Sequence, residues 1–186
     1  MCYKLFTPFY PRVWADSAYR LPYERMAEKG IRGLIFDVDN TLAFHNVPAD
    51  QKAGDLFSYL HRLGFATCLL SNNKEPRVRD FARAVGAYYV FKGGKPGIKG
   101  YQKSMAQMGT DAKHTVAVGD QLFTDIWGAN RAGIYSVLVT PMNPKEEIQI
   151  VLKRFLERPV LWMYQRKHPG EPFGGQPIRT EAQDSR

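Results

Sequence analysis

Cysteine is scarce in this chain, and long apolar runs are missing from it. Only Cys2 and Cys68 are present among 186 residues, too few for a disulfide framework, which favours a reducing compartment. No run reaches the roughly 18 consecutive apolar residues that a membrane-spanning helix needs. The first residues also lack a basic segment followed by an apolar one, so no secretory leader is expected. These shortages argue against a disulfide-stabilised secreted domain and favour a cytoplasmic protein.

Acidic side chains are also in short supply. The sequence has 18 Asp and Glu against 26 Lys and Arg, which gives a net charge of +8. This excess favours acidic partners such as nucleic acid, anionic lipid or phosphorylated small molecules. Nucleic acid is disfavoured, because no stacking or groove-reading motif accompanies the charge. The four histidines lack metal-ligand spacing, and Gly93-Gly94 lacks the Gly-Lys-Ser/Thr ending of a nucleotide-binding loop.

Short apolar runs alternate with segments of helical periodicity through the middle of the chain. The runs are 31–36, 65–70, 87–91, 114–118 and 134–139. Glycines stand where helices are expected to stop before the next strand: Gly30, Gly64, Gly86, Gly109 and Gly133. Near-continuous apolar strands that alternate with helices are typical of a parallel sheet covered on both faces. The sequence therefore predicts a doubly wound α/β domain over residues 31–141.

The two flanks of this domain have a different composition. Residues 1–30 form an aromatic flank, with seven aromatic side chains in the first 23 positions. Residues 142–168 are predicted to form a closing helix followed by an aromatic and basic segment. Gly, Pro and polar residues dominate 169–186, where a mobile tail is expected.

Two expectations concern these flanks in particular. The closing helix is predicted over 145–158 and is expected to end at Arg158-Pro159, because the residue before a proline is biased away from helix. The aromatic side chains of 1–23 and of 160–164, the latter followed by Arg166-Lys167, allow two interpretations. They either dock at a lipid interface, where aromatic rings are enriched, or pack against the sheet as core.

Four short polar segments each follow one of the apolar runs. They are Asp37-Val38-Asp39-Asn40-Thr41, Ser71-Asn72-Asn73, Lys95-Pro96, and Gly119-Asp120 with Asp125. Ligands of open parallel sheets bind beyond the carboxyl ends of the strands, so the four segments are expected to meet in one crevice. Each segment alone is a common turn, cap or surface pattern. Their occurrence together, in order and at strand ends, favours a catalytic site.

Phosphoryl transfer through an aspartate would use these residue types. Asp37 is the candidate nucleophile, because a carboxylate can attack phosphorus and form an aspartyl-phosphate. Asp39 lies two residues on and suits a general acid for the leaving alkoxide, then a general base for water. Asp120, supported by Asp125, supplies the further carboxylate needed for Mg²⁺, which prefers oxygen ligands.

The remaining polar residues suit the binding of a phosphate group. Ser71 and the backbone N–H groups around Asn72 are expected to donate to the non-bridging phosphate oxygens. Lys95 would add a positive charge that pairs with both the phosphate and the nucleophile. Lys92 and Lys99 are further cations expected near the phosphate.

These segments resemble the motifs of the haloacid dehalogenase superfamily of aspartate-dependent phosphatases. Phe36–Leu42 is similar to its first motif, Leu70-Ser71-Asn72 to its second, Lys95-Pro96 to its third and Val118–Ile126 to its fourth. The similarity covers roughly residues 31–141. It implies a Rossmann-like α/β core and Mg²⁺-dependent hydrolysis of phosphomonoesters.

The resemblance also implies a role for each matching residue. Asp37 would be the nucleophile and Asp39 the acid and base, while Ser71, Asn72 and Lys95 would bind phosphate. Asp37, the backbone carbonyl of Asp39, Asp120 and Asp125 would form the protein's share of the Mg²⁺ site, with Asp125 binding directly or through its neighbours.

A narrower similarity is to the capless YqeG-type subfamily, whose relatives include phosphatidylglycerophosphate phosphatases. Only 29 residues separate Thr41 from Ser71, enough for one helix and one strand but not for a cap domain. An open site suits a phosphate on a large carrier, so this resemblance implies a lipid headgroup as substrate and peripheral contact with the inner, anionic membrane surface. The alternatives are a phosphatase for nucleic-acid ends, phosphoproteins or small metabolites, and a non-catalytic binding module on the same fold.

Overall fold

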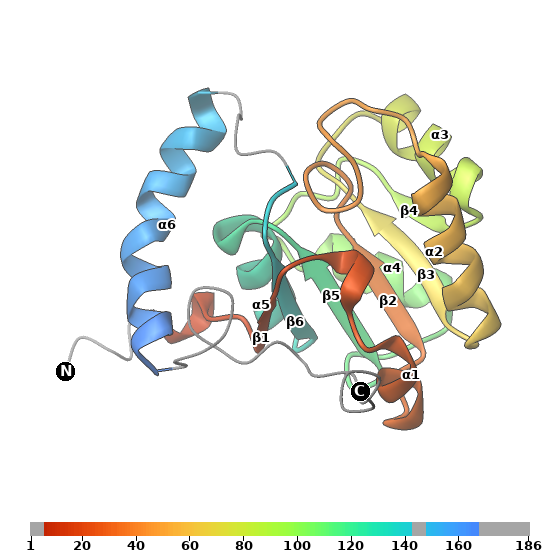
Figure 1. The fold of residues 1–186 in the computed structure, drawn as a ribbon, viewed down its shortest axis with the longest axis horizontal. Coiled ribbons are helices and arrows are strands. Elements are labelled where there is room, and N and C mark those ends of the chain that lie inside the picture. Colours follow the sequence, from red (N-terminus) through yellow and green to blue (C-terminus); the bar gives the residue numbers. More distant parts are fainter. Residues whose placement is uncertain (1–5, 143–147, 168–186) are drawn as a thin grey trace, which may run out of the picture.

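The computed structural model describes residues 6–142 and 148–167, with side chains described over 6–142 and 156–166. In these residues six strands form one parallel sheet, in the order β1-β6-β5-β2-β3-β4. The strands are β1 Val13–Ala15, β2 Gly33–Phe36, β3 Ala66–Leu70, β4 Tyr88–Val90, β5 Thr115–Gly119 and β6 Tyr135–Val139. The order reverses at β2, between β5 and β3, which confirms the predicted doubly wound α/β fold (Figure 1).

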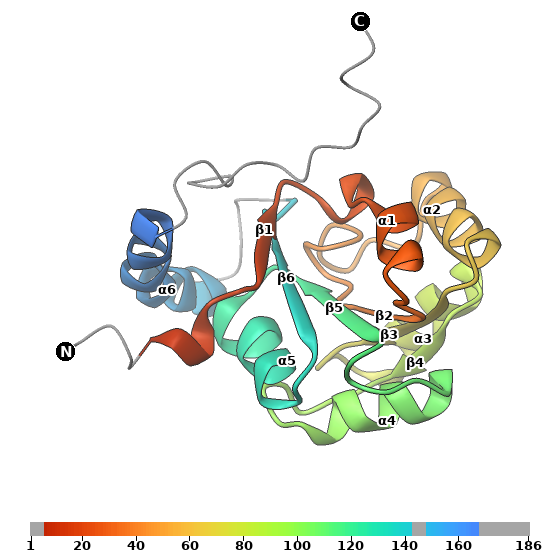
Figure 2. The same cartoon turned by 90° about the horizontal axis from the view of Figure 1, so that it is seen from below.

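Helices cover both faces of the sheet because the strands are apolar on both faces. The helices are α1 Tyr23–Glu28, α2 Gln51–Arg62, α3 Glu75–Val85, α4 Lys99–Met108, α5 Trp127–Arg131 and α6 Ile148–Lys167, and a π-helical turn, η4, spans Leu122–Ile126. Leu34 and Phe36 of β2 join the core under α1, α2 and α3, whereas Ile35 packs under α4 and α5. Figure 2 shows α1 and α2 on one side of the sheet, with α4 and α5 on the other.

The aromatic flank contributes to the sheet and to its core. Val13 and Trp14 of β1 pair in register with Val137 and Leu138 of β6, a strand that the sequence analysis did not predict. Trp14 is 5% exposed and packs in a cluster with Leu138, while Tyr23 is 1% exposed. The lipid-docking interpretation is therefore wrong for these two aromatic residues, and their interpretation as core is confirmed.

The predicted end of the closing helix at Arg158-Pro159 is wrong. Helix α6 continues through Pro159 to Lys167, although an interior proline removes one backbone hydrogen bond and disfavours the helix by about 3 kcal/mol. Packing explains the continuation, because Val160 and Tyr164 beyond the proline are 2% and 1% exposed in the cluster around Trp14. None of the helices in the described ranges is both long and apolar enough to cross a membrane. The predicted tail, 169–186, lies outside the described residues.

Candidate active site

The four polar segments meet beyond the carboxyl ends of the strands, as predicted. Asp37 directly follows β2, Ser71 follows β3 and Asp120 follows β5, while Lys95 lies in the loop after β4. Together they surround an open pocket of about 220 Å³. Its lining is polar and comes from Asp37, Asp39, Asn40, His45, Ser71, Asn72, Asn73, Lys95, Gln121, Thr124 and Asp125. Lys92 and Lys99 are exposed and are not among the lining residues.

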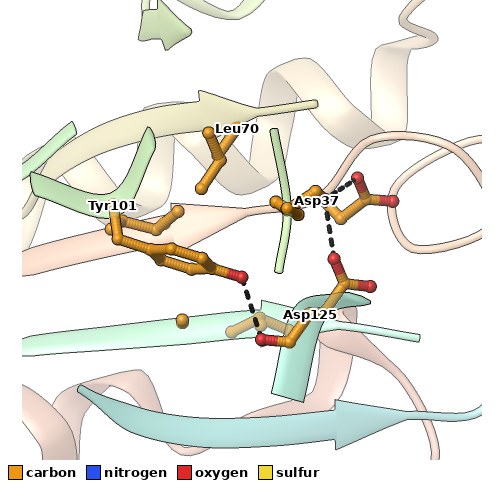
Figure 3. A pocket seen from close by; sticks show the side chains of 8 residues that line it. Asp37, Leu70, Tyr101 and Asp125 are labelled. Atoms are coloured by element: carbon orange, nitrogen blue, oxygen red, sulfur yellow. Dashed lines mark hydrogen bonds and ion pairs between the residues drawn. The ribbon is translucent and has the colours of Figure 1, made fainter. Parts of the chain in front are cut away.

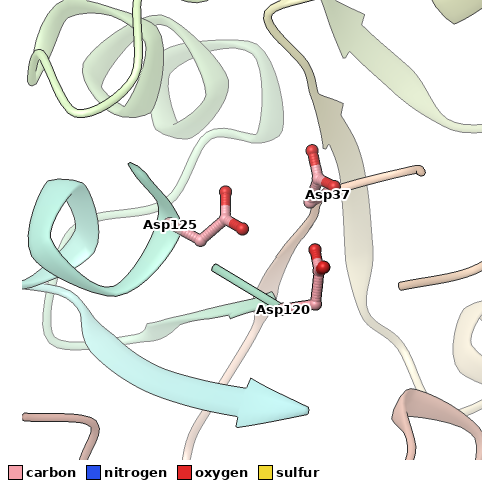
Figure 4. Close-up of side chains that lie close together, drawn as sticks. All are labelled: Asp37, Asp120 and Asp125. Atoms are coloured by element: carbon pink, nitrogen blue, oxygen red, sulfur yellow. The ribbon is translucent and has the colours of Figure 1, made fainter. Parts of the chain in front are cut away.

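Three carboxylates lie close enough together to hold one metal ion. Asp37, Asp120 and Asp125 each offer an oxygen atom, and these atoms lie within 4.8 Å of one another (Figure 4). Asp120 and Asp125 are 1% and 6% exposed, so their charges are shielded from water. Buried like charges repel unless a cation compensates them, and carboxylate oxygens are the ligands that Mg²⁺ prefers. The cluster therefore fits a hard divalent cation.

Lys95 is the cation that the protein itself places against this cluster. Its Nζ donates to Oδ1 of Asp37 and to Oδ1 of Asp125, each at 2.6 Å, and its side chain is 4% exposed. Burial alone would lower the pKa of Lys95, but Asp125 and Asp37 outweigh it and hold the pKa above its usual range. Lys95 therefore stays charged, and Figure 3 shows the two carboxylates that it bridges.

The electrostatics of Asp37 suit a nucleophile that functions with a metal ion. Burial raises the pKa of Asp37 to about 7; Lys95 opposes the rise, and Asp125 and Asp39 add to it. Without a metal the carboxylate therefore binds a proton near neutral pH. A divalent cation favours the ionised form, so metal binding is expected to release protons and to weaken as the pH falls below about 7.

Asp39 lines the same pocket but is not part of the three-carboxylate cluster. One carboxylate oxygen accepts a hydrogen bond from Asn73 Nδ2 at 2.7 Å, and the other from Arg77 Nη2 at 3.0 Å. The backbone N–H of Asn46 donates to the second oxygen at 3.1 Å. The sequence analysis assigned no role to these three donors. Asn73 stood within a predicted segment, whereas no pattern marked Arg77 or Asn46.

The predicted phosphate binders have different surroundings. Ser71 is 4% exposed, and its hydroxyl accepts the backbone N–H of Asn73 at 3.1 Å. The Asn72 side chain is bonded to the backbone of Lys95: Oδ1 accepts its N–H at 2.8 Å, and Nδ2 donates to its carbonyl at 3.1 Å. The side-chain amide of Asn72 thus positions the backbone of Lys95.

Residues outside the predicted set hold the acidic loop in place. Thr41 Oγ1 donates to Oδ1 of Asp120 at 3.2 Å, and Tyr101 donates its hydroxyl proton to the carbonyl of Asp125 at 2.9 Å (Figure 3). Glu157 of α6 is 1% exposed and accepts the backbone N–H of Leu122, the first residue of η4, at 2.8 Å. The long outer helix therefore contacts the turn that carries Asp125.

Gly119, the last residue of β5, leaves the space that Asp125 occupies. A Cβ at this position would lie 2.5 Å from Cβ and Cγ of Asp125, far inside contact distance. We expect Gly119→Ala to displace this carboxylate and to weaken Mg²⁺ binding by about 10- to 100-fold, the range found when the support of a metal ligand is lost. Calorimetric titration with Mg²⁺ measures the effect.

A second glycine provides the matched control for this variant. An added Cβ at Gly54 in α2 meets nothing within 4 Å, so Gly54→Ala should bind Mg²⁺ as the unmodified protein does. If Gly119→Ala bound Mg²⁺ as tightly as the unmodified protein, the proposal that Gly119 leaves space for the Asp125 carboxylate would be contradicted.

Comparisons with known proteins agree with this geometry. A family model described as haloacid dehalogenase-like hydrolase matches residues 43–133. "Probable phosphatase YqeG" of Bacillus subtilis is 30% identical over 160 residues, which cover 86% of this chain and 93% of that protein. "Phosphatidylglycerophosphate phosphatase 1, chloroplastic" of Chlamydomonas reinhardtii is 29% identical over 161 residues, which cover 79% of this chain and 59% of that longer protein.

A solved structure shares the fold. The hypothetical protein XCC2798 from Xanthomonas campestris superimposes with a TM-score of 0.51 at 15% identity, over 69% of this chain and 75% of that one. At this identity the likeness concerns the arrangement of strands and helices.

Proposed function

Because the chain belongs to the haloacid dehalogenase-like hydrolases and is a phosphatase of that family, we propose that it hydrolyses phosphomonoesters through an aspartyl-phosphate on Asp37. The observation that supports this most is the arrangement around Asp37. Its carboxylate lies at the end of β2, 2.6 Å from the Lys95 ammonium and beside two further buried carboxylates. A purely structural ion pair would not need one lysine between two carboxylates with a third carboxylate close by in an open pocket.

Two displacements at phosphorus make up the proposed reaction. In the first, an oxygen of Asp37 bonds to phosphorus while the ester P–O bond breaks, and Asp39 gives its proton to the departing alkoxide. In the second, water attacks the same phosphorus and gives a proton to Asp39. The bond between phosphorus and Asp37 then breaks, releasing inorganic phosphate and restoring both carboxyl groups. Throughout, Ser71, the backbone N–H of Asn72 and Lys95 would bind the non-bridging oxygens.

Magnesium is the proposed cofactor. Asp37, Asp120 and Asp125 would hold the ion, together with the backbone carbonyl of Asp39. When bound, Mg²⁺ would neutralise the charge of an anionic phosphate beside an anionic nucleophile. The chain's own contribution is to keep the three carboxylates together, which Thr41 and Tyr101 do through the hydrogen bonds described above.

The proposed substrate is phosphatidylglycerophosphate, and its product would be phosphatidylglycerol. The partial similarity to the algal phosphatase named for this lipid supports the assignment. The shape of the site supports it as well, since only a loop, α2 and β3 separate Thr41 from Ser71, and no domain within residues 6–142 and 148–167 covers the pocket. A phosphomonoester on a flexible glycerol arm can enter such a pocket while its acyl chains stay in the bilayer. The proposal therefore includes peripheral contact with an anionic membrane.

A substrate panel tests this proposal. The purified protein with Mg²⁺ is offered phosphatidylglycerophosphate in mixed micelles, glycerol phosphate, sugar phosphates, nucleotides, phosphorylated DNA ends, a phosphopeptide and an aryl phosphate. We expect kcat/KM for the lipid to exceed that for every other physiological phosphate by about tenfold or more. A soluble substrate with a higher kcat/KM than the lipid would overturn the lipid assignment but would not affect the assignment of the protein as a phosphatase. No release from any compound would contradict the proposed chemistry.

A further inference from the structure

A four-residue turn at the rim of the active-site pocket carries two exposed apolar side chains. Phe44 and Val47 are 46% and 43% exposed, and the backbone N–H of Val47 closes the turn on the carbonyl of Phe44 at 3.0 Å. Between them, His45 lines the pocket and Asn46 donates its backbone N–H to Asp39. The loop between β2 and α2 projects beyond the carboxyl ends of the strands (Figure 1). Single exposed apolar residues are ordinary, but this pair lies directly beside the proposed acid and base.

Exposed cations lie on the same rim. Lys74 follows Asn73, which bonds to Asp39, and Lys92 donates its backbone N–H to the Asn73 carbonyl at 3.0 Å. The side chains of both lysines are exposed. The nearest acid along the chain, Glu75, accepts a hydrogen bond from the Tyr89 hydroxyl at 3.4 Å. The rim therefore combines an apolar tip with exposed positive charge.

We propose that the turn 44–47 enters the interfacial layer of an anionic lipid surface while Lys74 and Lys92 contact headgroup phosphates. In this orientation the pocket opens onto a phosphomonoester carried by the same surface. The inference rests on the proposed function and deepens it, because it names the part of the chain that meets the lipid. The turn would meet the lipid directly, without the help of a cap domain.

A lipid surface fits this tip better than a folded protein partner. A stable protein interface buries at least about 1,200 Å² in total, far more than two side chains on one turn provide. Removing exposed apolar side chains from water and bringing cations close to anionic headgroups both favour binding to such a membrane. Two side chains and two cations suit reversible peripheral binding.

A second exposed apolar surface provides the competing hypothesis. On α6, Leu156 and Trp162 are 58% and 53% exposed, and the Arg166 guanidinium lies 3.8 Å from the centre of the Trp162 ring. That surface belongs to the outer helix, and none of its described residues lines the active-site pocket. Trp162→Ala therefore tests whether α6, rather than the turn 44–47, meets the lipid.

Vesicle binding measures the proposed contact directly. In the Asp37→Asn background, which prevents turnover, Phe44→Ser and Val47→Ser are co-sedimented with phosphatidylglycerol–phosphatidylcholine vesicles and with phosphatidylcholine alone. We expect Phe44→Ser to lower the partition coefficient on anionic vesicles by about tenfold, with a smaller loss for Val47→Ser. Tyr88→Ser is the matched control, because Tyr88 is 51% exposed but begins β4, at the opposite end of the strand from the site. Unchanged binding of Phe44→Ser, or loss of binding in Trp162→Ala alone, would overturn the proposal.

Kinetics separate a lipid contact from a perturbed active site. In the otherwise unmodified enzyme, Phe44→Ser should lower kcat/KM for phosphatidylglycerophosphate in micelles while leaving turnover of a soluble aryl phosphate unchanged. Equal losses on both substrates would mean that the turn acts only through Asp39, which overturns the docking role. If the turn binds vesicles but the enzyme does not hydrolyse the lipid, the lipid contact of the turn would be supported and phosphatidylglycerophosphate refuted as the substrate. If the enzyme prefers the lipid and Phe44→Ser does not change kcat/KM for it, the substrate assignment would be supported and the lipid contact of the turn refuted.

Discussion

Asp37→Asn is expected to abolish phosphate release, with a loss of about 10⁴-fold or more, as for other covalent catalytic residues. An amide cannot form the acyl phosphate, whereas its oxygen can still accept the hydrogen bond that Lys95 now donates to Asp37. The fold should therefore persist. Release of phosphate from an aryl phosphate with Mg²⁺ measures the activity, and circular dichroism with thermal unfolding measures the fold.

Two controls make this result specific. Asp55→Asn changes an exposed carboxylate of α2 that accepts a hydrogen bond from Gln51, and it should leave activity unchanged. Chelation of the divalent cation should silence the unmodified enzyme. Mass spectrometry of acid-quenched reactions should find one added phosphoryl group on the peptide containing Asp37. Retained activity in Asp37→Asn would refute the proposed nucleophile.

Lys95→Met should produce the largest loss of stability as well as a loss of activity. The substitution leaves Asp37 and Asp125 buried without the cation that lies 2.6 Å from each. Removing one partner of a buried ion pair costs about 3–5 kcal/mol of unfolding free energy. Urea unfolding with a chelator present should find a loss of this size at pH 8.

The loss should be smaller at pH 6, for a reason that follows from Asp37. Its folded-state pKa of about 7 already exceeds the ordinary aspartate value of 3.8, so this carboxyl disfavours folding increasingly as the pH rises between the two values. Lys95 is the main influence that lowers this pKa, and without it the penalty would extend to higher pH. At pH 6 the Asp37 carboxyl of Lys95→Met takes up a proton, which avoids most of the free-energy cost of burying its charge without Lys95.

An exposed lysine serves as the comparison for this variant. Lys103→Met on α4 removes the same charge from the surface and should change stability by less than about 0.5 kcal/mol. Saturating Mg²⁺ should also raise the melting temperature of the unmodified protein, because the ion binds only the folded carboxylate cluster. Equal stability of Lys95→Met and the unmodified protein at pH 8 would contradict the electrostatic role of Lys95.

The alternation of apolar runs and helical periods was enough to predict that the candidate site residues meet at one edge of the sheet. Apolar runs of strand length alternate with helical periods, so the strands had to be parallel and to end at one edge. Asp37 and Ser71 follow such a run directly and Asp120 follows one after Gly119, so their convergence needed no knowledge of side-chain positions. The glycines before the strands also behaved as predicted: Gly64, Gly86 and Gly109 have positive φ angles.

How these residues are held depends on the packing of segments that are distant in the sequence. The strand β1 is three residues long and too short for a periodic signal, and it forms because β6 offers an open edge. Helix α6 passes through Pro159 because burial of Val160 and Tyr164 outweighs one lost backbone hydrogen bond. Local sequence preference was overruled in both cases by packing against distant segments.

The hydrogen-bond partners of Asp39 show the same limit at the site. Asp39 is 38 residues from Arg77 and 34 from Asn73, and these contacts depend on how α3 and the loop before it lie against the loop after β2. Glu157 accepts a hydrogen bond from the backbone N–H of Leu122, which lies 35 residues earlier in the sequence. Glu157 belongs to α6, the helix that was predicted to end at Arg158. Hydrophobic periodicity specifies elements and strand ends, whereas hydrogen bonds between side chains on different elements are set only when those elements pack.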